Sequence, residues 1–123
     1  MIEILKNKTG LFIFQLKDKE GEIILTSNGY TQKTNCMKGI RSLIHNSKNE
    51  ISFVIKTNEK TREWSLNVKA GNGKITAHGF PMYTENEAKG VMKKVMSIVP
   101  SSKIKDLTKP SSLFSKDEIA GNV

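Results

Sequence analysis

Two stretches of alternating apolar and polar residues organise the chain, one in each half. In residues 11–17 the side chains of Phe12, Phe14 and Leu16 fall on one side, and in residues 63–69 the same alternation returns with Trp64, Leu66 and Val68. A period of two is typical of a half-buried strand. A glycine-containing turn and a second short apolar run follow each stretch, so each pattern predicts a β-hairpin.

The period changes to that of a helix after each hairpin. Met37, Ile40 and Ile44 recur at helical spacing in residues 30–46, and the second helical stripe in residues 84–99 consists of Ala88, Val91, Met92 and Val95. This spacing indicates one helix with a single apolar face in each half. Thr84 with Glu87 is the sequence pattern of a capping box, and Thr31 or Thr34 is a candidate cap for the first helix.

These elements repeat in the same order. Residues 11–27 are echoed by residues 63–79, and short strands are expected at residues 2–5, 51–57 and 104–107. The pattern predicts three strands and a helix, twice, with a final strand, in one α+β domain. We place the domain at residues 1–108, with repeat one at 1–49 and repeat two at 50–108, and interpret residues 109–123 as a disordered tail.

A glycine lies inside each predicted helix, at Gly39 and Gly90. Glycine within a helix costs roughly 0.5–1 kcal/mol relative to alanine. Because the residue is used twice at matching places, we expect both helix backbones to approach the sheet closely.

Composition narrows the class of protein. The 123 residues carry a formal net charge of +8 and a single cysteine, Cys36, and 37% of the residues are hydrophobic. No apolar run approaches the ~20 residues that a membrane-spanning helix needs, and one cysteine fits a reducing compartment. We therefore predict a basic cytoplasmic protein with no membrane association. A positive charge of this size favours acidic partners or nucleic acid, and it also keeps a small protein soluble.

Several segments together resemble the YegP-like family of small bacterial and archaeal proteins. They are KDKEGEIILTSNGY, MKGIRSL, KAGNGKI, KGVMKKV and SSKIKDLT, in that order, and the resemblance spans residues 1–108. It implies two tandem β3-α-β repeats that share one antiparallel sheet and exchange their C-terminal strands. The strands at Ile51–Thr57 and Ile104–Leu107 would then pair with the other repeat. In the second repeat Phe80-Pro81-Met82 replaces Asn28-Gly29-Tyr30. The family offers no established activity to transfer.

The sequence contains no readable catalytic, cofactor-binding or metal-binding constellation. His45 and His78 lie in different repeats without ligand-spaced companions, and Cys36 has no base near it in the sequence. A zinc site needs several converging ligands, and a cysteine nucleophile needs an activating group. The glycine-rich segment 70–74 joins two strands and is a hairpin turn, not a phosphate-binding loop. We therefore predict a protein that is not an enzyme and has no cofactor.

Two surfaces are candidates for binding. The outer faces of both helices are basic, and if both helices lie on one side of the sheet they form a candidate nucleic-acid surface of Lys33, Lys38, Arg41, Lys89, Lys93 and Lys94. An ordinary solvated helix face explains the same lysines. On the opposite side of the sheet, Leu11, Ile13 and Ile24 are expected to form an exposed apolar patch, which favours self-association or a protein partner. The alternative is that sheet curvature or the N-terminal segment covers them.

The resulting hypothesis is a small, non-enzymatic binding or interaction module of unknown role. The alternative is weak, largely non-specific nucleic-acid binding through the basic helix faces.

Overall fold

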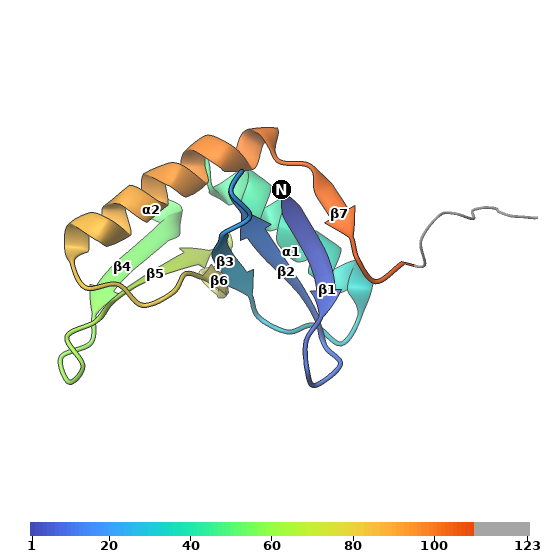
Figure 1. The fold of residues 1–123 in the computed structure, drawn as a ribbon, viewed down its shortest axis with the longest axis horizontal. Helices are drawn as coiled ribbons and strands as arrows, with labels where there is room; N and C mark the ends of the chain where they lie inside the picture. Colours follow the sequence, from blue (N-terminus) through green and yellow to red (C-terminus); the bar gives the residue numbers. More distant parts are fainter. Residues whose placement is uncertain (110–123) are drawn as a thin grey trace, which may run out of the picture.

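The computed structural model describes residues 1–109, so the predicted tail lies outside the described residues except for Lys109. In these residues three strands precede each of two α-helices, and a seventh strand follows the second helix (Figure 1). In order they are β1 (Ile2–Lys6), β2 (Phe12–Lys17), β3 (Ile23–Ser27), α1 (Lys33–Asn46), β4 (Phe53–Thr57), β5 (Trp64–Lys69), β6 (Ile75–His78), α2 (Glu85–Ile98) and β7 (Ile104–Asp106). Short 3₁₀ turns, η1 (Glu50–Ser52) and η2 (Val99–Ser101), follow the two α-helices.

All seven strands form one sheet, in the order β4-β5-β6-β3-β2-β1-β7. Two β-β-β-α-β units account for this sheet because β4 serves both: it closes the first unit and opens the second. The predicted strand exchange is confirmed, since β4 pairs with β5 of the second unit and β7 pairs with β1 of the first. The β1–β7 pair is parallel, so the sheet is mixed and not wholly antiparallel as expected. Parallel pairing requires a long connection between the two strands, and the chain between β1 and β7, which includes both helices, provides one.

Both hairpins of the repeat carry a bulge at the same place. Between β2 and β3 the register shifts so that Ile24 is extra, and between β5 and β6 it shifts so that Thr76 is extra. The turn that precedes each bulge contains a glycine at φ +83°, Gly21 and Gly73, a conformation that glycine adopts without steric cost. An extra residue interrupts the strict alternation of faces.

The two helices pack on the same face of the sheet and begin differently. Thr84 caps α2 in a full capping box with Glu87, as predicted. At α1 the N-cap is Gln32, whose side chain makes no capping hydrogen bond, so neither Thr31 nor Thr34 caps this helix. Figure 1 shows α2 running across the molecule from the β4 edge toward β7.

The expectation of close glycine packing holds for one helix only. A Cβ atom at Gly39 would lie 2.5 Å from the Tyr30 hydroxyl and 3.2 Å from the Phe14 ring, so α1 does approach the sheet closely. At Gly90 nothing lies within 4 Å, and the prediction is wrong there. Gly90 is solvent-exposed, and α2 meets the sheet through larger side chains such as Met92.

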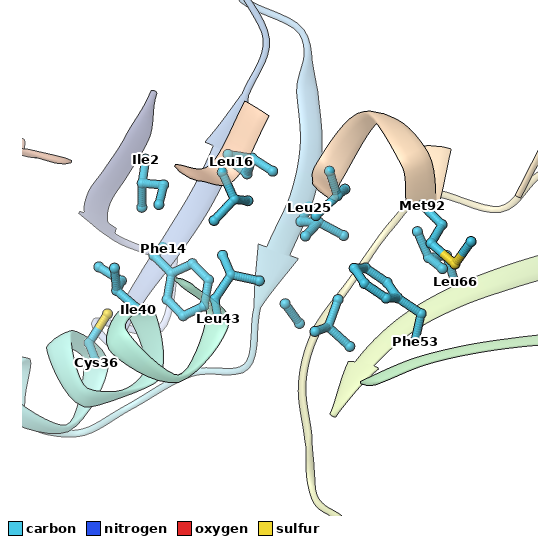
Figure 2. Packing of buried hydrophobic residues seen from close by; sticks show 14 of the residues in the cluster. Ile2, Phe14, Leu16, Leu25, Cys36, Ile40, Leu43, Phe53, Leu66 and Met92 are labelled. Atoms are coloured by element: carbon cyan, nitrogen blue, oxygen red, sulfur yellow. The ribbon is translucent and has the colours of Figure 1, made fainter. Parts of the chain in front are cut away.

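One hydrophobic core lies between the sheet and both helices. Figure 2 shows the Phe14 ring beside Ile40 and Leu43 of α1, with Phe53, Leu66 and Met92 grouped on the α2 side. Phe14, Leu43 and Leu66 are fully buried, and burying each such side chain stabilises the fold by roughly 1.5–3 kcal/mol. Trp64, which alternates with the same face as Leu66 and Val68, is half-buried and lies outside this cluster.

Candidate functional site

The two units meet at a short seam between β3 and β6. Only Thr26–His78 and Ser27–Ala77 are paired across it, and the Asn28 side-chain amide extends it by donating to the Ile75 carbonyl oxygen at 2.8 Å. Beyond His78 the chain stays with β5, because the Gly79 amide donates to the Leu66 carbonyl oxygen at 2.9 Å. The sheet therefore divides at the end of this seam.

Phe80 lies where the sheet divides, and it lines two small cavities. One, of about 180 Å³, is lined by Thr26, His78, Gly79, Phe80 and Pro81. The other, of about 90 Å³, is lined by Ile23, Ile24, Phe80, Met82 and Val91. The first cavity has a hydroxyl and an imidazole beside an aromatic ring, whereas the second is apolar. We call the Phe80 side chain and the first cavity the seam pocket.

The internal repeat provides a comparison for Phe80. The Phe12–Tyr30 bridge of the first unit corresponds to the Trp64–Met82 bridge of the second, and both are antiparallel. Counting from these bridges, Asn28 corresponds to Phe80. Phe80 is 60% exposed, so the second unit presents an aromatic ring to solvent where the first presents an amide.

The same alignment matches Thr31 with Tyr83. Tyr83 is 82% exposed. Its backbone amide donates to the Glu87 carboxylate at 2.8 Å, which fixes the start of α2 but leaves the ring free. Burial explains most aromatic side chains in proteins, and it explains neither Phe80 nor Tyr83.

The face of the sheet away from the helices is polar. One row of directly opposed residues crosses all seven strands on this open face: Lys105, Glu3, Gln15, Thr26, His78, Asn67 and Val54. The rows on either side of it are buried, one with Leu16 and Leu25 and the other with Ala77 and Val68. Residues in these rows alternate along each strand, which places the polar row toward solvent. The exposure of His78 agrees with its place in this row.

Lysines predominate among the strand residues of the open face. Lys56 and Lys69 belong to it by alternation with core-facing residues of their strands, and Lys105 belongs to it because it is opposed to Glu3. Lys17 joins Glu3 in an ion pair of 2.8 Å. Glu3 is the one carboxylate among the strand residues that face this side in the described chain. The open face therefore has an excess of positive charge next to the seam pocket.

The six basic residues predicted on the helix faces are distributed differently from the expectation. Lys33 pairs with Asp106 at 2.8 Å, Lys94 with Asp18 at 2.7 Å and Lys89 with Glu85 at 3.5 Å. Within residues 1–109, Lys38, Arg41 and Lys93 make no ion pair and are exposed. Half of the predicted surface therefore participates in intramolecular ion pairs, which lowers the charge that it can offer to phosphates.

Two of these ion pairs hold distant parts of the chain together. The Asp106 carboxylate accepts hydrogen bonds from the Lys33 ammonium and from the backbone amide and hydroxyl of Thr108. Burial alone would raise the pKa of Asp106, but the hydrogen bonds outweigh it and lower the pKa to about 2. Lys33 also lies 5.9 Å from the centre of the Phe12 ring. These contacts attach β7 to the start of α1.

Asp18 has a comparable role in the turn between β2 and β3. One of its carboxylate oxygens accepts from the Glu20 and Glu22 amides, and the other accepts from the Lys94 ammonium. The hydrogen bond from Lys94 lowers the pKa of Asp18 despite its burial, and Asp18 in turn raises the pKa of Lys94. The pair fixes the first hairpin to α2.

The predicted apolar patch does not form an exposed surface. Ile13 is 8% exposed, and Ile24 packs against the core because the bulge turns it away from its expected face. Leu11 is half-buried, and a Cβ atom at Gly29 would lie 2.6 Å from Leu11 Cδ1, so Leu11 covers that glycine. The prediction of an exposed patch is therefore wrong.

Candidates for chemistry are isolated in the described part of the chain. Cys36 is fully buried, and burial, followed by the nearby Asp106 charge, raises the pKa of its thiol to about 11. A thiol with such a pKa stays protonated at neutral pH and is a poor nucleophile. Residues 1–109 contain no group of three or more histidine, cysteine or carboxylate side chains that could hold a metal ion. His45 lies in the last turn of α1, far along the chain from His78.

A more open cavity, of about 630 Å³, lies between the start of β1 and η2. Its lining includes Glu3, Lys17 and Asp18. The two carboxylates and Lys17 are already engaged in the ion pairs described above, and the other charged side chains of the lining are the exposed Lys19 and Lys103. The described lining of this cavity contains no aromatic side chain on which a ligand could stack. The seam pocket is the stronger candidate.

The fold and the site define a class: a small α+β protein of two interlocked repeats, with a polar open sheet face and an exposed aromatic at the seam. A family model described as a domain of unknown function, DUF1508, matches residues 7–51. UPF0339 protein YegP of Yersinia pestis is 36% identical over 110 residues, which cover 86% of this chain and 94% of that protein. The chain belongs to the UPF0339 family, as its resemblance to YegP-like proteins implied.

Two solution structures of relatives have the same fold. The chain matches yegP of Escherichia coli, described as a protein of unknown function, with a TM-score of 0.80 and 33% identity over 89% of this chain and 94% of that one. It matches a UPF0339 protein of Shewanella oneidensis with a TM-score of 0.78 and 32% identity over 86% and 89% of the two chains. No function is named for these relatives. Among residues 1–109, no helix is long and apolar enough to cross a membrane.

The signal for Phe80 was present in the sequence. The replacement of Asn28-Gly29-Tyr30 by Phe80-Pro81-Met82 is visible when the repeats are aligned. An aromatic residue at a position that is polar in the other repeat indicates an exposed ring. That inference also requires the equivalence of the two bridges, which only the structure provides.

Proposed function

We propose that this protein is a non-enzymatic binding module whose binding surface is the seam pocket with the adjoining open face of the sheet. The observation that supports the proposal most is the 60% exposure of Phe80, at a position where the matching repeat has Asn28. An exposed aromatic ring beside polar side chains is common in binding surfaces, since it offers a large contact area at low entropic cost.

Other features support the non-enzymatic part of the proposal. The carboxylates of lowest exposure, those of Asp18 and Asp106, are engaged in structural ion pairs, and Cys36 is held as a neutral thiol. General acid–base or nucleophilic catalysis needs such groups free and near one another. The cytoplasm remains the compartment that we expect, because of the single cysteine.

Nucleic-acid binding through the helix faces stays a prediction. The residues that could still carry it are Lys38, Arg41 and Lys93, which are exposed and without an ion pair in residues 1–109. Three cations spread over two helices give a weaker field than the six that the sequence indicated.

Affinity purification from the cell that makes the protein tests the proposal. The bait would be compared with a Phe80→Ser, Tyr83→Ser double variant and with Ile51→Ser, which removes an apolar side chain that is 82% exposed at a distant site. We expect bound material with the wild type and with Ile51→Ser, and its loss with the double variant.

Urea unfolding of all three proteins would confirm that they are folded. The proposal is refuted if the double variant retains the same bound material as the wild type, or if nothing accompanies any of the three.

A further inference from the structure

We infer that the seam pocket and the open face bind single-stranded nucleic acid, with one base stacked on Phe80 and the phosphates near the lysines of the sheet. This inference rests on the proposed function and names the class of ligand. It places the nucleic acid on the face of the sheet opposite to the helices.

The first argument is the chemistry of the pocket. The cavity of about 180 Å³ combines the face of the Phe80 ring with the Thr26 hydroxyl and the His78 imidazole. A nucleobase has an apolar face that stacks on aromatic rings and an edge of hydrogen-bond donors and acceptors. An aliphatic side chain of a protein partner would use the ring but would offer no hydrogen bond to the His78 imidazole, whereas the edge of a base can form one.

The second argument is charge. On the strands of the open face, Lys56, Lys69 and Lys105 carry positive charges that no carboxylate of residues 1–109 neutralises through an ion pair. The whole chain has a net charge of +8, which favours a polyanion. The field at the open face is therefore complementary to a phosphate backbone.

The third argument is shape. The polar row runs across the strands from Lys105 on β7 to Asn67 on β5 and passes beside the seam pocket. The six strands from β7 to β5, at about 4.8 Å spacing, give a track of roughly 24 Å, long enough for several nucleotides. Duplex nucleic acid cannot place a base in the seam pocket, because its bases are paired and stacked. The surface therefore favours single strands.

The test is fluorescence anisotropy with labelled dT and rU 12-mers, titrated with the full-length protein over a salt series from about 20 to 200 mM. Three phosphate contacts predict a slope of log K against log salt of roughly −2, since single strands give about −0.7 per contact. A duplex of the same length should bind at least several-fold more weakly.

Two substitutions at Phe80 separate stacking from simple apolar contact. Phe80→Leu keeps apolar bulk but removes the ring, and we expect roughly a tenfold loss of affinity. Phe80→Trp keeps an aromatic face and should bind as well as the wild type. Equal affinities for the leucine variant and the wild type would overturn the assignment of the stacking role.

Lysine variants identify the face. We expect Lys56→Gln with Lys69→Gln to weaken binding several-fold and to reduce the salt slope, while Lys38→Gln with Lys93→Gln on the helices has little effect. The reverse result would overturn the inference in favour of the helix faces. No detectable binding at 20 mM salt also overturns it.

The proposed function can survive that result. If purified nucleic acid does not bind while nuclease-resistant protein is lost from the Phe80→Ser, Tyr83→Ser bait, the surface is a protein-binding site and only the ligand class falls. If both experiments fail, the proposed function falls as well.

Discussion

Asp106→Asn should destabilise the protein by about 2 kcal/mol at neutral pH. The fold lowers the pKa of this carboxyl from 3.8 to about 2. Because each pKa unit corresponds to about 1.36 kcal/mol, folding stabilises the charged form by about 2 kcal/mol relative to the protonated form. The side chain is only 14% exposed, which limits screening by solvent. Asparagine keeps the shape of aspartate but not the charge that attracts Lys33.

The pH dependence gives this prediction its sign. A carboxyl whose pKa is lowered by folding contributes its full stability above the unfolded value of 3.8 and loses it as the pH falls through the folded value of about 2. The difference between wild type and Asp106→Asn should therefore be constant from pH 7 to about pH 5 and shrink to roughly half by pH 3.

Urea unfolding followed by circular dichroism, at several pH values between about 7 and 3, measures the difference. Glu59→Gln is the matched control, because Glu59 is an exposed carboxylate that makes no ion pair within residues 1–109. If the unfolding free energies of wild type and Asp106→Asn differ by less than about 0.5 kcal/mol at pH 7, or if their difference does not change down to pH 3, the Asp106 contacts do not stabilise β7.

Other predictions concern the helix glycines, the first hairpin and the thiol. Gly39→Ala should lower the free energy of unfolding by about 1–3 kcal/mol because the new Cβ clashes with the Tyr30 hydroxyl. Gly90→Ala has open space around it and should raise the free energy of unfolding by up to about 1 kcal/mol. Thermal unfolding compares the two variants, and equal effects would contradict the packing described. Asp18→Asn should lower the urea midpoint at pH 7, and the difference from the wild type should shrink as the pH falls through the lowered pKa of Asp18. If the substitution has no effect in a Lys94→Met background, Lys94 is confirmed as the partner of Asp18. Cys36 should react with a thiol reagent at pH 8 only as fast as the protein unfolds, and rapid labelling of the native protein would contradict its burial and its pKa of about 11.

The architecture could be predicted from the sequence because each element is encoded locally. Alternation in residues 11–17 and 63–69, and helical spacing before Asn46 and before Ile98, identify the strands and helices without knowledge of their partners. The exchange of closing strands came from resemblance, since nothing local says which strand Ile104–Asp106 will pair with.

The contacts that the sequence could not reveal are those between distant residues. Asp18 and Lys94 are 76 residues apart, and Lys33 and Asp106 are 73 residues apart, so their ion pairs have no spacing signature. The bulge at Ile24 also could not be predicted from the sequence, because an extra residue in a strand has no residue type of its own and changes only the face to which a side chain points. For this reason Ile24, predicted on the outer surface, packs partly buried against the core.

The pairing of β7 with β1 has a consequence for synthesis of the chain. Ile2–Lys6 is made first, and one side of this strand stays without its partner until Ile104–Asp106 has been made. During translation the first unit can form its hairpins and α1, but it presents an unpaired strand edge of the kind that promotes association between chains. Pairing with β7 covers that side of the five-residue β1 and leaves the three-residue β7 as the edge strand at this end of the sheet. A very short edge strand is a poorer template for association between chains.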